Sequence, residues 1–340
     1  MIKAFEEFRK KLDEIMIKAI NKRVVLYGYG RSGQFIQWYA DYYHSIQVDF
    51  IVRESMKTSI PYSFDTYPPA VFDFNYKDIN NAVIWITFAD SDKAREKLEE
   101  LGYVEGEDYF DFCQIVYGRD KTWEPDHSQD VFLQKKTGNR DIQFLEYLEF
   151  KYGCNFVTEI DVSHYRREGI CVGYKVTAMR EIFSILDKCH CVPKATDAVF
   201  DIGSGKGGGV ISFLDYGFEM VGGAELEQRI YDVSKRNFEL IGERLGGGQI
   251  QLFCKDAMQL TSELDVYNWF YCFLSNGGHW RKLAENIRGS VERKPRKVMI
   301  IVRNPYAIAQ ESFEANSFIL INSFAIDTRQ RVVNVYTNDV

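Results

Sequence analysis

The sequence VFDIGSGKGGG, residues 199–209, decides the fold of this chain. A short apolar run ends at Ile202, and glycines at positions 203, 205 and 207 follow before an apolar helical pattern resumes at Val210. Glycine adopts positive φ readily and lets a ligand approach the backbone, as a nucleotide lying across the end of a strand requires. The stretch therefore predicts a buried strand, a sharp turn and a helix, with a flat, nucleotide-like ligand at the turn.

Two carboxylates accompany this turn. Asp201 stands two residues before Gly203, where it would repel the phosphates of a dinucleotide but attract a cation. The next predicted strand, 219–225, ends in Glu225, and a single carboxylate can accept both hydroxyls of a ribose. Glu225 therefore indicates a nucleoside without naming the cofactor, whereas Asp201 favours a positively charged one.

A second glycine-rich turn lies near the N-terminus. Gly28, Gly30 and Gly33 follow an apolar run in the Gly-x-Gly-x-x-Gly spacing of dinucleotide-binding turns. The strand predicted about 20 residues further on is followed by Arg53, where an NAD site would have an acid, and an arginine there suits a phosphate. These four residues are the candidate nucleotide-binding set of this half. A scaffold that binds nothing is the alternative, because the fingerprint alone has many false positives.

Length and composition limit the class of protein. The 340 residues suggest about two domains, and the 46% hydrophobic and 27% charged residues are ordinary for globular chains. A net charge of −7 disfavours nucleic acid and anionic membranes as partners. Seven scattered cysteines, no signal-like segment and no long apolar run predict a cytoplasmic protein without a disulfide framework.

The pattern along the chain predicts an α/β protein with two Rossmann-like doubly wound domains. Residues 1–120 are expected to form the first, beginning with an amphipathic helix that could cap the domain or join two copies of the chain. The polar, aperiodic stretch 121–138 is the expected linker. Residues 139–340 are expected to form the second domain.

On these motifs, the chain from about residue 169 onward resembles the class I S-adenosylmethionine (SAM) dependent methyltransferases. The resemblance implies SAM as cofactor and a seven-stranded sheet whose last strand is antiparallel. It implies adenine contacts for the acid and the following backbone amide after the third strand, at Asp256 and Ala257, although an acid there is also a common turn residue. Tyr174 would border the pocket. The implied cofactor-binding residues are Asp201, Gly203, Ser204, Gly205, Gly207, Glu225, Asp256 and Ala257.

The loop after the fourth predicted strand departs from the family pattern. Residues 274–278 read LSNGG, where many relatives have an acid or Asn followed by proline, and Asn276 takes the place of that Asn. A hydroxyl acceptor would need a base, and His279 is the first candidate and His164 the second. Asn276 and His279 are therefore the candidate catalytic residues, while an ordinary surface role is commoner for an isolated histidine.

The N-terminal half, over about residues 20–117, is similar to small Rossmann-like accessory domains of bacterial sugar-modifying proteins. That similarity implies recognition of a nucleotide-sugar. The resulting expectation is a methyltransferase that transfers a methyl group directly, in line, to a small-molecule or carbohydrate-linked acceptor. The alternatives are a non-catalytic module that binds SAM or a nucleotide-sugar, and an NAD(P)-dependent oxidoreductase that uses the N-terminal fingerprint.

No metal site is expected. Cys189 and Cys191 flank a histidine, but on a strand alternate residues point to opposite faces, and no second cysteine pair follows at ligand spacing. Signatures of other enzyme classes, such as a Walker lysine, a nucleophile elbow or a zinc-protease helix, are also missing from the sequence.

Overall fold

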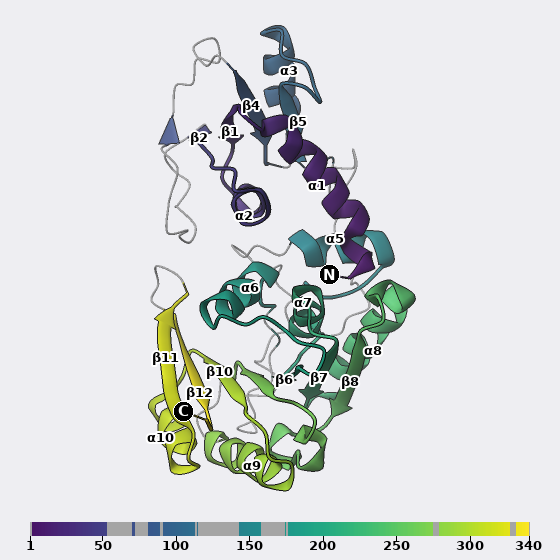
Figure 1. The fold of residues 1–340 in the computed structure, drawn as a ribbon. Helices are drawn as coiled ribbons and strands as arrows, with labels where there is room; N and C mark the ends of the chain where they lie inside the picture. The colour runs from purple at the N-terminus through teal and green to yellow at the C-terminus, as the bar shows by residue number, and fades with distance from the viewer. Residues whose placement is uncertain are drawn as a thin grey trace, which may run out of the picture. The chain divides into compact units, whose positions relative to one another are not determined.

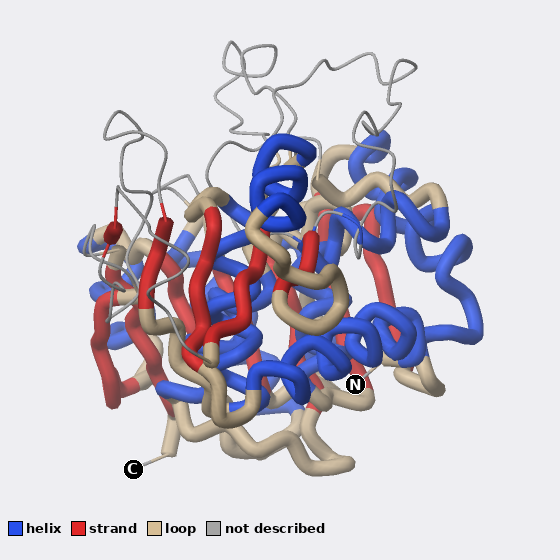
Figure 2. Tube along the Cα trace, turned by 90° about the horizontal axis from the view of Figure 1, so that it is seen from above, coloured by secondary structure: helices blue, strands red, loops and turns tan. Residues whose placement is uncertain are grey.

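The computed structural model describes residues 2–52, 70–71, 81–88, 91–112, 114, 143–157, 174, 176–274, 279–326 and 331–339; the remaining residues are grey in Figure 2. The side chains of residues 31, 70, 71 and 143 are not described. The chain divides into two compact units. One contains the described parts of Phe5–Asp126 and Asn139–Lys151, and the other the described parts of Met1–Ala4 and Tyr152–Val340. Both combine helices with a sheet whose described strands are parallel or mostly parallel, so the predicted α/β class is confirmed.

The first unit is built on a parallel sheet. Its described strands follow the order β3-β2-β1-β4-β5. They are β1 (Arg23–Tyr27), β2 (Phe50–Val52), β3 (Ala70–Val71), β4 (Ala82–Ile86) and β5 (Tyr109–Asp111). The helices that accompany them are α1 (Glu6–Ala19), α2 (Arg31–His44), α3 (Asp92–Glu100) and α5 (Gln143–Tyr152), and the short helix η1 (Lys3–Phe5) precedes α1.

An aromatic cluster determines the unit to which α5 belongs. The Phe144 ring lies 4.8 Å from the ring of Phe5, 5.3 Å from that of Phe8 and 5.1 Å from that of Phe35. Such pairs contribute about 0.5–1.5 kcal/mol each beyond the burial of their area. Residues 143–151 therefore group with the first unit, whereas the sequence placed them in the domain 139–340.

The N-terminal glycine turn has two glycines that the chain itself requires. A Cβ on Gly28, which has φ +94°, would lie 2.7 Å from the Phe88 ring. A Cβ on Gly33 would lie 3.0 Å from the Gly28 oxygen and from Thr87 Oγ1. Gly30, by contrast, has φ −83° and no atom within 4 Å of a Cβ. Arg53, the fourth predicted residue of this set, lies outside the described residues.

The second unit contains a seven-stranded sheet in the order β11-β12-β10-β9-β6-β7-β8. Only β12 runs antiparallel to its neighbours among these described strands. The strands are β6 (Ala198–Ile202), β7 (Met220–Glu225), β8 (Gln249–Cys254), β9 (Trp269–Cys272), β10 (Met299–Arg303), β11 (Ile319–Ala325) and β12 (Val332–Thr337). The helices are α6 (Met179–Lys188), α7 (Gly208–Tyr216), α8 (Gln228–Ile241), α9 (Trp280–Arg293) and α10 (Ala307–Ala315), with short helices η5 (Gly242–Leu245), η6 (Ala257–Gln259) and η7 (Ser262–Leu264).

Helices cover both faces of this sheet, with α6 and α7 on one face and α9 and α10 on the other (Figure 1). Phe200 and Ile202 of β6 belong to the core that α9 and α10 close. Because successive strand residues point to opposite faces, the intervening Asp201 lies on the α7 face. The alternation of side chains along β6 thus places the Asp201 carboxylate on the face of the sheet that α7 covers, beside the glycine turn.

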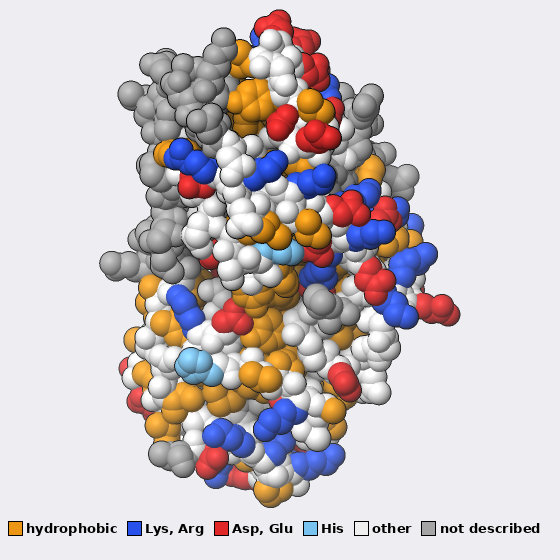
Figure 3. All heavy atoms as spheres, turned by 45° about the horizontal axis from the view of Figure 1, so that its top comes forward, with side chains coloured by type: hydrophobic (Ala, Val, Ile, Leu, Met, Phe, Trp, Pro, Cys, Tyr) orange, Lys and Arg blue, Asp and Glu red, His pale blue; other side chains and the backbone are white. Residues whose placement is uncertain are grey.

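One expectation about the cysteines is wrong. Cys189 is not on a strand, because it directly follows the last residue of α6, and His190 has a positive φ of 53°. Within the described ranges no group of three or more His, Cys, Asp or Glu residues could hold a metal ion. No described helix is long and apolar enough to cross a membrane. On the face shown in Figure 3, basic and acidic side chains are intermixed.

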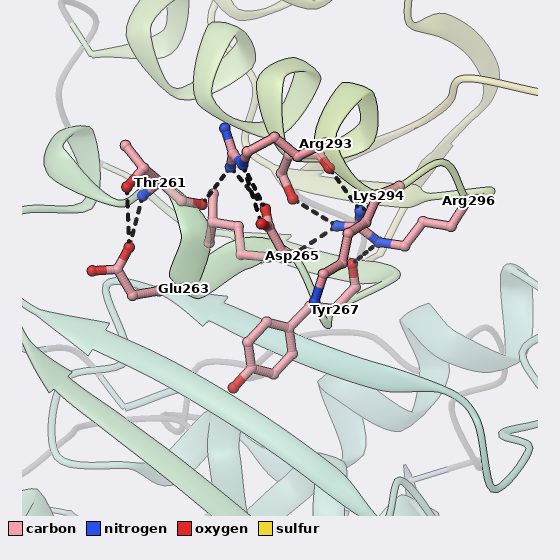
Figure 4. A network of polar contacts seen from close by, with 9 residues as sticks. Thr261, Glu263, Asp265, Tyr267, Arg293, Lys294 and Arg296 are labelled. Carbon is pink, nitrogen blue, oxygen red and sulfur yellow. Dashed lines mark hydrogen bonds and ion pairs between the residues drawn. The ribbon is translucent and has the colours of Figure 1, made fainter.

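Arg296 joins the end of α9 to the segment before β9 (Figure 4). Its Nε donates to the backbone oxygen of Tyr267 at 2.7 Å. Its Nη2 donates to the backbone oxygen of Leu264 at 2.8 Å and to Ser290 Oγ at 2.9 Å. Nη1 donates to the oxygens of Ser290 and Lys294 at 3.1 and 2.9 Å. Every nitrogen of this guanidinium therefore has an acceptor. The Leu264 and Ser290 oxygens also accept from backbone amides, whereas the Tyr267 and Lys294 oxygens accept from Arg296.

We expect Arg296→Met to lower the free energy of unfolding by about 2–4 kcal/mol, because five hydrogen bonds are lost and the Tyr267 and Lys294 oxygens lose their donor. The matched control is Arg288→Met, which alters a half-buried side chain on α9 and removes its ion pair with Glu292 at 3.0 Å. Arg288→Met should change the free energy of unfolding by no more than about 0.5 kcal/mol. Urea unfolding measures both, and equal losses of stability in the two variants would contradict the anchoring role of Arg296.

Candidate nucleotide-binding site at the glycine turn

The turn between β6 and α7 has the left-handed backbone that the sequence predicted. Gly203, Gly205 and Gly207 have φ values of +78°, +55° and +90°. The amides of Gly203 and Ser204 donate to the Ala224 oxygen at 3.0 and 2.9 Å. These bonds fix the turn against the carboxyl end of β7, so the ends of two parallel strands meet at this place.

Packing within the chain also requires some of these glycines. A Cβ on Gly205 would lie 2.3 Å from the Tyr174 ring, and one on Gly207 would lie 2.5 Å from the Phe238 ring. Gly203 differs, because the nearest atom to its Cβ would be in Leu274 at 3.4 Å. At Gly203 the positive φ of +78° requires glycine, and the space around it is also open to a ligand.

Sequence reasoning missed two glycines that shape the site. A Cβ on Gly209 would lie 2.2 Å from Asp201 Oδ2, so the carboxylate packs directly on the first turn of α7. A Cβ on Gly223 of β7 would lie 2.8 Å from the Ser204 side chain. Both glycines directly follow another glycine in the sequence, and this pattern could have identified them. A glycine inside a strand, such as Gly223, often marks close approach of another backbone.

Asp201 is a buried carboxyl at the end of β6, with 5% of its surface exposed. Burial, and secondarily the neighbouring Glu225, raises the pKa of Asp201 to about 7. The two causes act in the same direction: burial deprives the Asp201 carboxylate of water, and the like charge of Glu225 repels it. A cationic ligand would supply the missing compensation.

Glu225 at the end of β7 is held by backbone amides. Its Oε2 accepts from the Gly205 amide at 3.0 Å and its Oε1 accepts from the Glu227 amide at 2.9 Å. Burial still raises the pKa of Glu225 despite these bonds. Each carboxylate oxygen has a second lone pair, so the oriented group retains the capacity to accept ligand hydroxyls.

Asp256 follows β8 at the same edge of the sheet. Its Oδ1 accepts from the Met258 amide at 2.9 Å, which makes it the N-terminal cap of η6. The turn-forming role is therefore present, and the adenine contacts of Asp256 and Ala257 stay predictions. The strand order places the residues after β6, β7 and β8 side by side, so Asp201, Glu225 and Asp256 come to one edge.

A short segment before α6 closes over the turn. Tyr174, which was predicted to border the pocket, is buried and donates its hydroxyl to the Phe156 oxygen at 2.6 Å. Lys206 is also buried and donates from Nζ to Asn155 Oδ1 at 2.8 Å. Asn237 Nδ2 donates to the oxygens of Asn155 and Lys206, each at 3.0 Å. Sequence reasoning did not identify Lys206, because its partners come from three distant parts of the chain.

The candidate catalytic residues are only partly described. His279 is exposed and directly precedes α9, and its backbone oxygen accepts from the Leu283 amide at 3.1 Å. Asn276 and His164 lie outside the described residues. A proton-transfer role for His279 stays a prediction.

Comparison with known proteins gave matches among solved structures alone. No protein-family model matches the chain, and no curated protein matches it. Similar structures include an RNA methyltransferase from Salinibacter ruber in complex with S-adenosyl-L-homocysteine, at 15% identity over 48% of this chain and 93% of that chain, with a TM-score of 0.37. A TehB-like SAM-dependent methyltransferase from Corynebacterium glutamicum has 13% identity over 52% and 95%, with a TM-score of 0.36. Magnesium protoporphyrin IX methyltransferase from Synechocystis, with bound S-adenosyl-L-homocysteine, has 16% identity over 47% and 81%, with a TM-score of 0.34.

The raised pKa of Asp201 predicts how stability depends on pH. Between about pH 4 and pH 7 the folded chain holds a proton that the unfolded chain has lost, so stability falls as the pH rises through that window. Asp201→Asn removes this loss. At pH 8.5 we expect the free energy of unfolding of the variant to exceed that of the natural chain by about 2–4 kcal/mol.

Urea unfolding at pH 5.5, 6.5, 7.5 and 8.5 measures this difference. The control is Asp232→Asn, which alters an exposed carboxyl on α8 and should follow the natural chain at every pH. Parallel profiles for the natural chain and Asp201→Asn would show that the Asp201 carboxyl is not held in its neutral form.

Proposed function

We propose that the second unit binds SAM and transfers its methyl group to a small-molecule or carbohydrate-linked acceptor. The observation that carries the proposal is the buried carboxyl of Asp201 at the glycine turn, next to a second buried carboxyl, Glu225. The Asp201 carboxylate would repel the phosphates of a dinucleotide, whereas SAM has a sulfonium and an ammonium group. The electrostatics of the turn therefore favour SAM over NAD.

The sheet supports the same proposal. The resemblance of the sequence to class I methyltransferases implies seven strands with an antiparallel last strand, and β12 has this orientation between β10 and β11. In parallel α/β sheets ligands bind outside the carboxyl ends of the strands, at the point where the strand order reverses. That point lies between β6 and β9, and the glycine turn follows β6.

The residues of the turn fit the parts of this cofactor. Glu225, oriented by two backbone amides, would accept the two ribose hydroxyls, and Asp201 would balance the positive charge. Gly203 leaves the backbone open to close approach. When bound, SAM supplies a methyl group on a sulfonium sulfur, which a nucleophile can displace directly. The chain would hold the reactants in line and exclude water, and His279 is the proposed base for a hydroxyl acceptor.

We expect Glu225→Ala to weaken SAM binding by about 1–3 kcal/mol, because the ribose hydroxyls lose their acceptor. The control Glu227→Ala alters the neighbouring side chain and should leave affinity within twofold. For the natural chain, affinity should fall as the pH drops below about 7, since a proton on Asp201 removes its charge. Isothermal titration calorimetry tests all three expectations. No heat with SAM or S-adenosylhomocysteine, together with tight NAD binding, would refute the proposal.

We further propose that the first unit binds a nucleotide-linked ligand at its own glycine turn. The specific observation is Gly30, which has an ordinary backbone conformation and no neighbour within 4 Å of a Cβ. Packing within the described chain gives no reason for glycine there, whereas close approach of a phosphate to the start of α2 gives one. An NAD(P)-dependent oxidoreductase and a scaffold without a ligand are the alternatives.

The two substitutions Gly30→Ala and Gly33→Ala separate these alternatives. Gly30→Ala should keep the free energy of unfolding within about 0.5 kcal/mol, while Gly33→Ala should lower it by about 1–3 kcal/mol because its Cβ meets the Gly28 oxygen at 3.0 Å. Gly30→Asp should abolish binding of a nucleotide-sugar and leave SAM affinity unchanged. Thermal shift of the full chain with UDP-glucose, NAD and NADP is the measurement. A shift with NADP alone supports the oxidoreductase, and no shift supports the scaffold.

A further inference from the structure

A second polar cluster lies on the same face of the sheet as Asp201. It consists of Arg303 at the end of β10, Tyr271 on β9, and Thr177 and Glu181 at the start of α6, and we call it the Arg303 cluster. Tyr271 pairs with Asp201 on one side and with Ile301 on the other. Because alternate residues of a strand share a face, Arg303 lies on the face of Tyr271 and Asp201.

All four side chains of the cluster are largely buried, and Arg303 has no exposed surface. Arg303 Nε forms an ion pair with Glu181 Oε1, and Nη1 donates to Thr177 Oγ1 at 3.4 Å. The guanidinium carbon lies 4.0 Å from the centre of the Phe273 ring. The guanidinium thus contacts both an aromatic ring and a carboxylate.

Two donors of the Arg303 cluster have no acceptor. Arg303 Nη2 is buried and makes no hydrogen bond in the described chain. The Tyr271 hydroxyl is also buried; Thr177 is its hydrogen-bonding neighbour, and its own proton has no acceptor among the described residues. Leaving a buried donor unsatisfied costs about 1–3 kcal/mol, and more for a charged group. A structural ion pair does not explain this, since apolar residues of similar size often replace a buried pair without loss of stability. Two unsatisfied donors on neighbouring strands indicate a ligand that brings acceptor oxygens.

We propose that Arg303 and Tyr271 bind a carboxylate group of the methyl acceptor, beside the methyl-donor site. This inference rests on the proposed function, which places the donor at Asp201 on the adjacent strand. A carboxylate has two oxygens, one for Arg303 Nη2 and one for the Tyr271 hydroxyl. A phosphate dianion fits less well, because Glu181 and Asp201 carry further carboxyl groups on this face.

The burial of the cluster affects the strength of this contact. Since Arg303 has no exposed surface, a carboxylate bound to it would be shielded from water, and charge-assisted hydrogen bonds are strongest under those conditions. The acid group can reach Nη2 only when side chains over the cluster shift. Arg303 is therefore a specificity-determining residue, and it would select acids over neutral molecules of the same shape.

The test compares acetate with acetamide, which have the same shape and differ in charge. The full chain is saturated with S-adenosylhomocysteine, and the side-chain nitrogen NMR signals of Arg303 are followed during each titration. We expect acetate to shift these signals and to bind at least tenfold more tightly than acetamide or inorganic phosphate. Calorimetry should show that Arg303→Met weakens acetate binding at least tenfold and Tyr271→Phe several-fold.

Two further variants separate this role from a structural one. Arg331→Met removes another arginine near Glu181, 3.7 Å from its Oε2, and should leave acetate binding within twofold. Glu181→Gln removes the carboxylate that competes for Arg303, so it should strengthen acetate binding even though the ion pair is broken. Unchanged or weaker binding in Glu181→Gln would overturn the proposal.

Equal binding of acetate and acetamide by the natural chain would also overturn it, as would acetate binding that survives Arg303→Met. Tighter binding of phosphate than of acetate would overturn the choice of a carboxylate. Affinity for S-adenosylhomocysteine is recorded in every variant and should not change. If the natural chain does not bind S-adenosylhomocysteine, the proposed methyl-donor site is wrong. The acetate titration tests the Arg303 cluster independently of that result.

Discussion

The second unit depends on one close contact, between the carboxylate at the end of β6 and the first turn of α7. Asp201 Oδ2 occupies the position where a side chain on Gly209 would begin. Glycine at 209 lets the helix start directly above the strand, and the turn can then bond to β7 through Gly203 and Ser204. The same contact removes Asp201 from water, so the packing that forms the turn also creates a buried charge that needs a partner.

Local patterns predicted most of this architecture. The apolar run that contains Asp201 leads directly into Gly203, and Glu225 ends the next predicted strand, so their geometry follows from strand and turn chemistry. The roles of Lys206 and Arg303 could not be predicted, because their partners come from elements far away in the chain. The role of Asp256 could be predicted only in part, because an acid directly after a strand suits both a turn cap and a ligand contact. The structure shows the cap.

The two glycine turns illustrate why a motif alone is ambiguous. At Gly28, Gly33, Gly205 and Gly207 a side chain would collide with the protein itself, so packing accounts for the glycine. At Gly30 and Gly203 the nearest atoms are absent or lie at van der Waals distance. At Gly203 the positive φ still requires glycine, whereas at Gly30 neither packing nor the sign of φ does.

The place of α5 affects how the chain can be divided. Residues 143–151 belong to the unit formed by the N-terminal residues, although more than thirty residues of sequence separate them from its last described strand. A gene fragment that ended near residue 120 would leave Phe5, Phe8 and Phe35 without the ring that they surround. Recombination that exchanged this unit between proteins would have to carry both segments together for the aromatic cluster to stay complete.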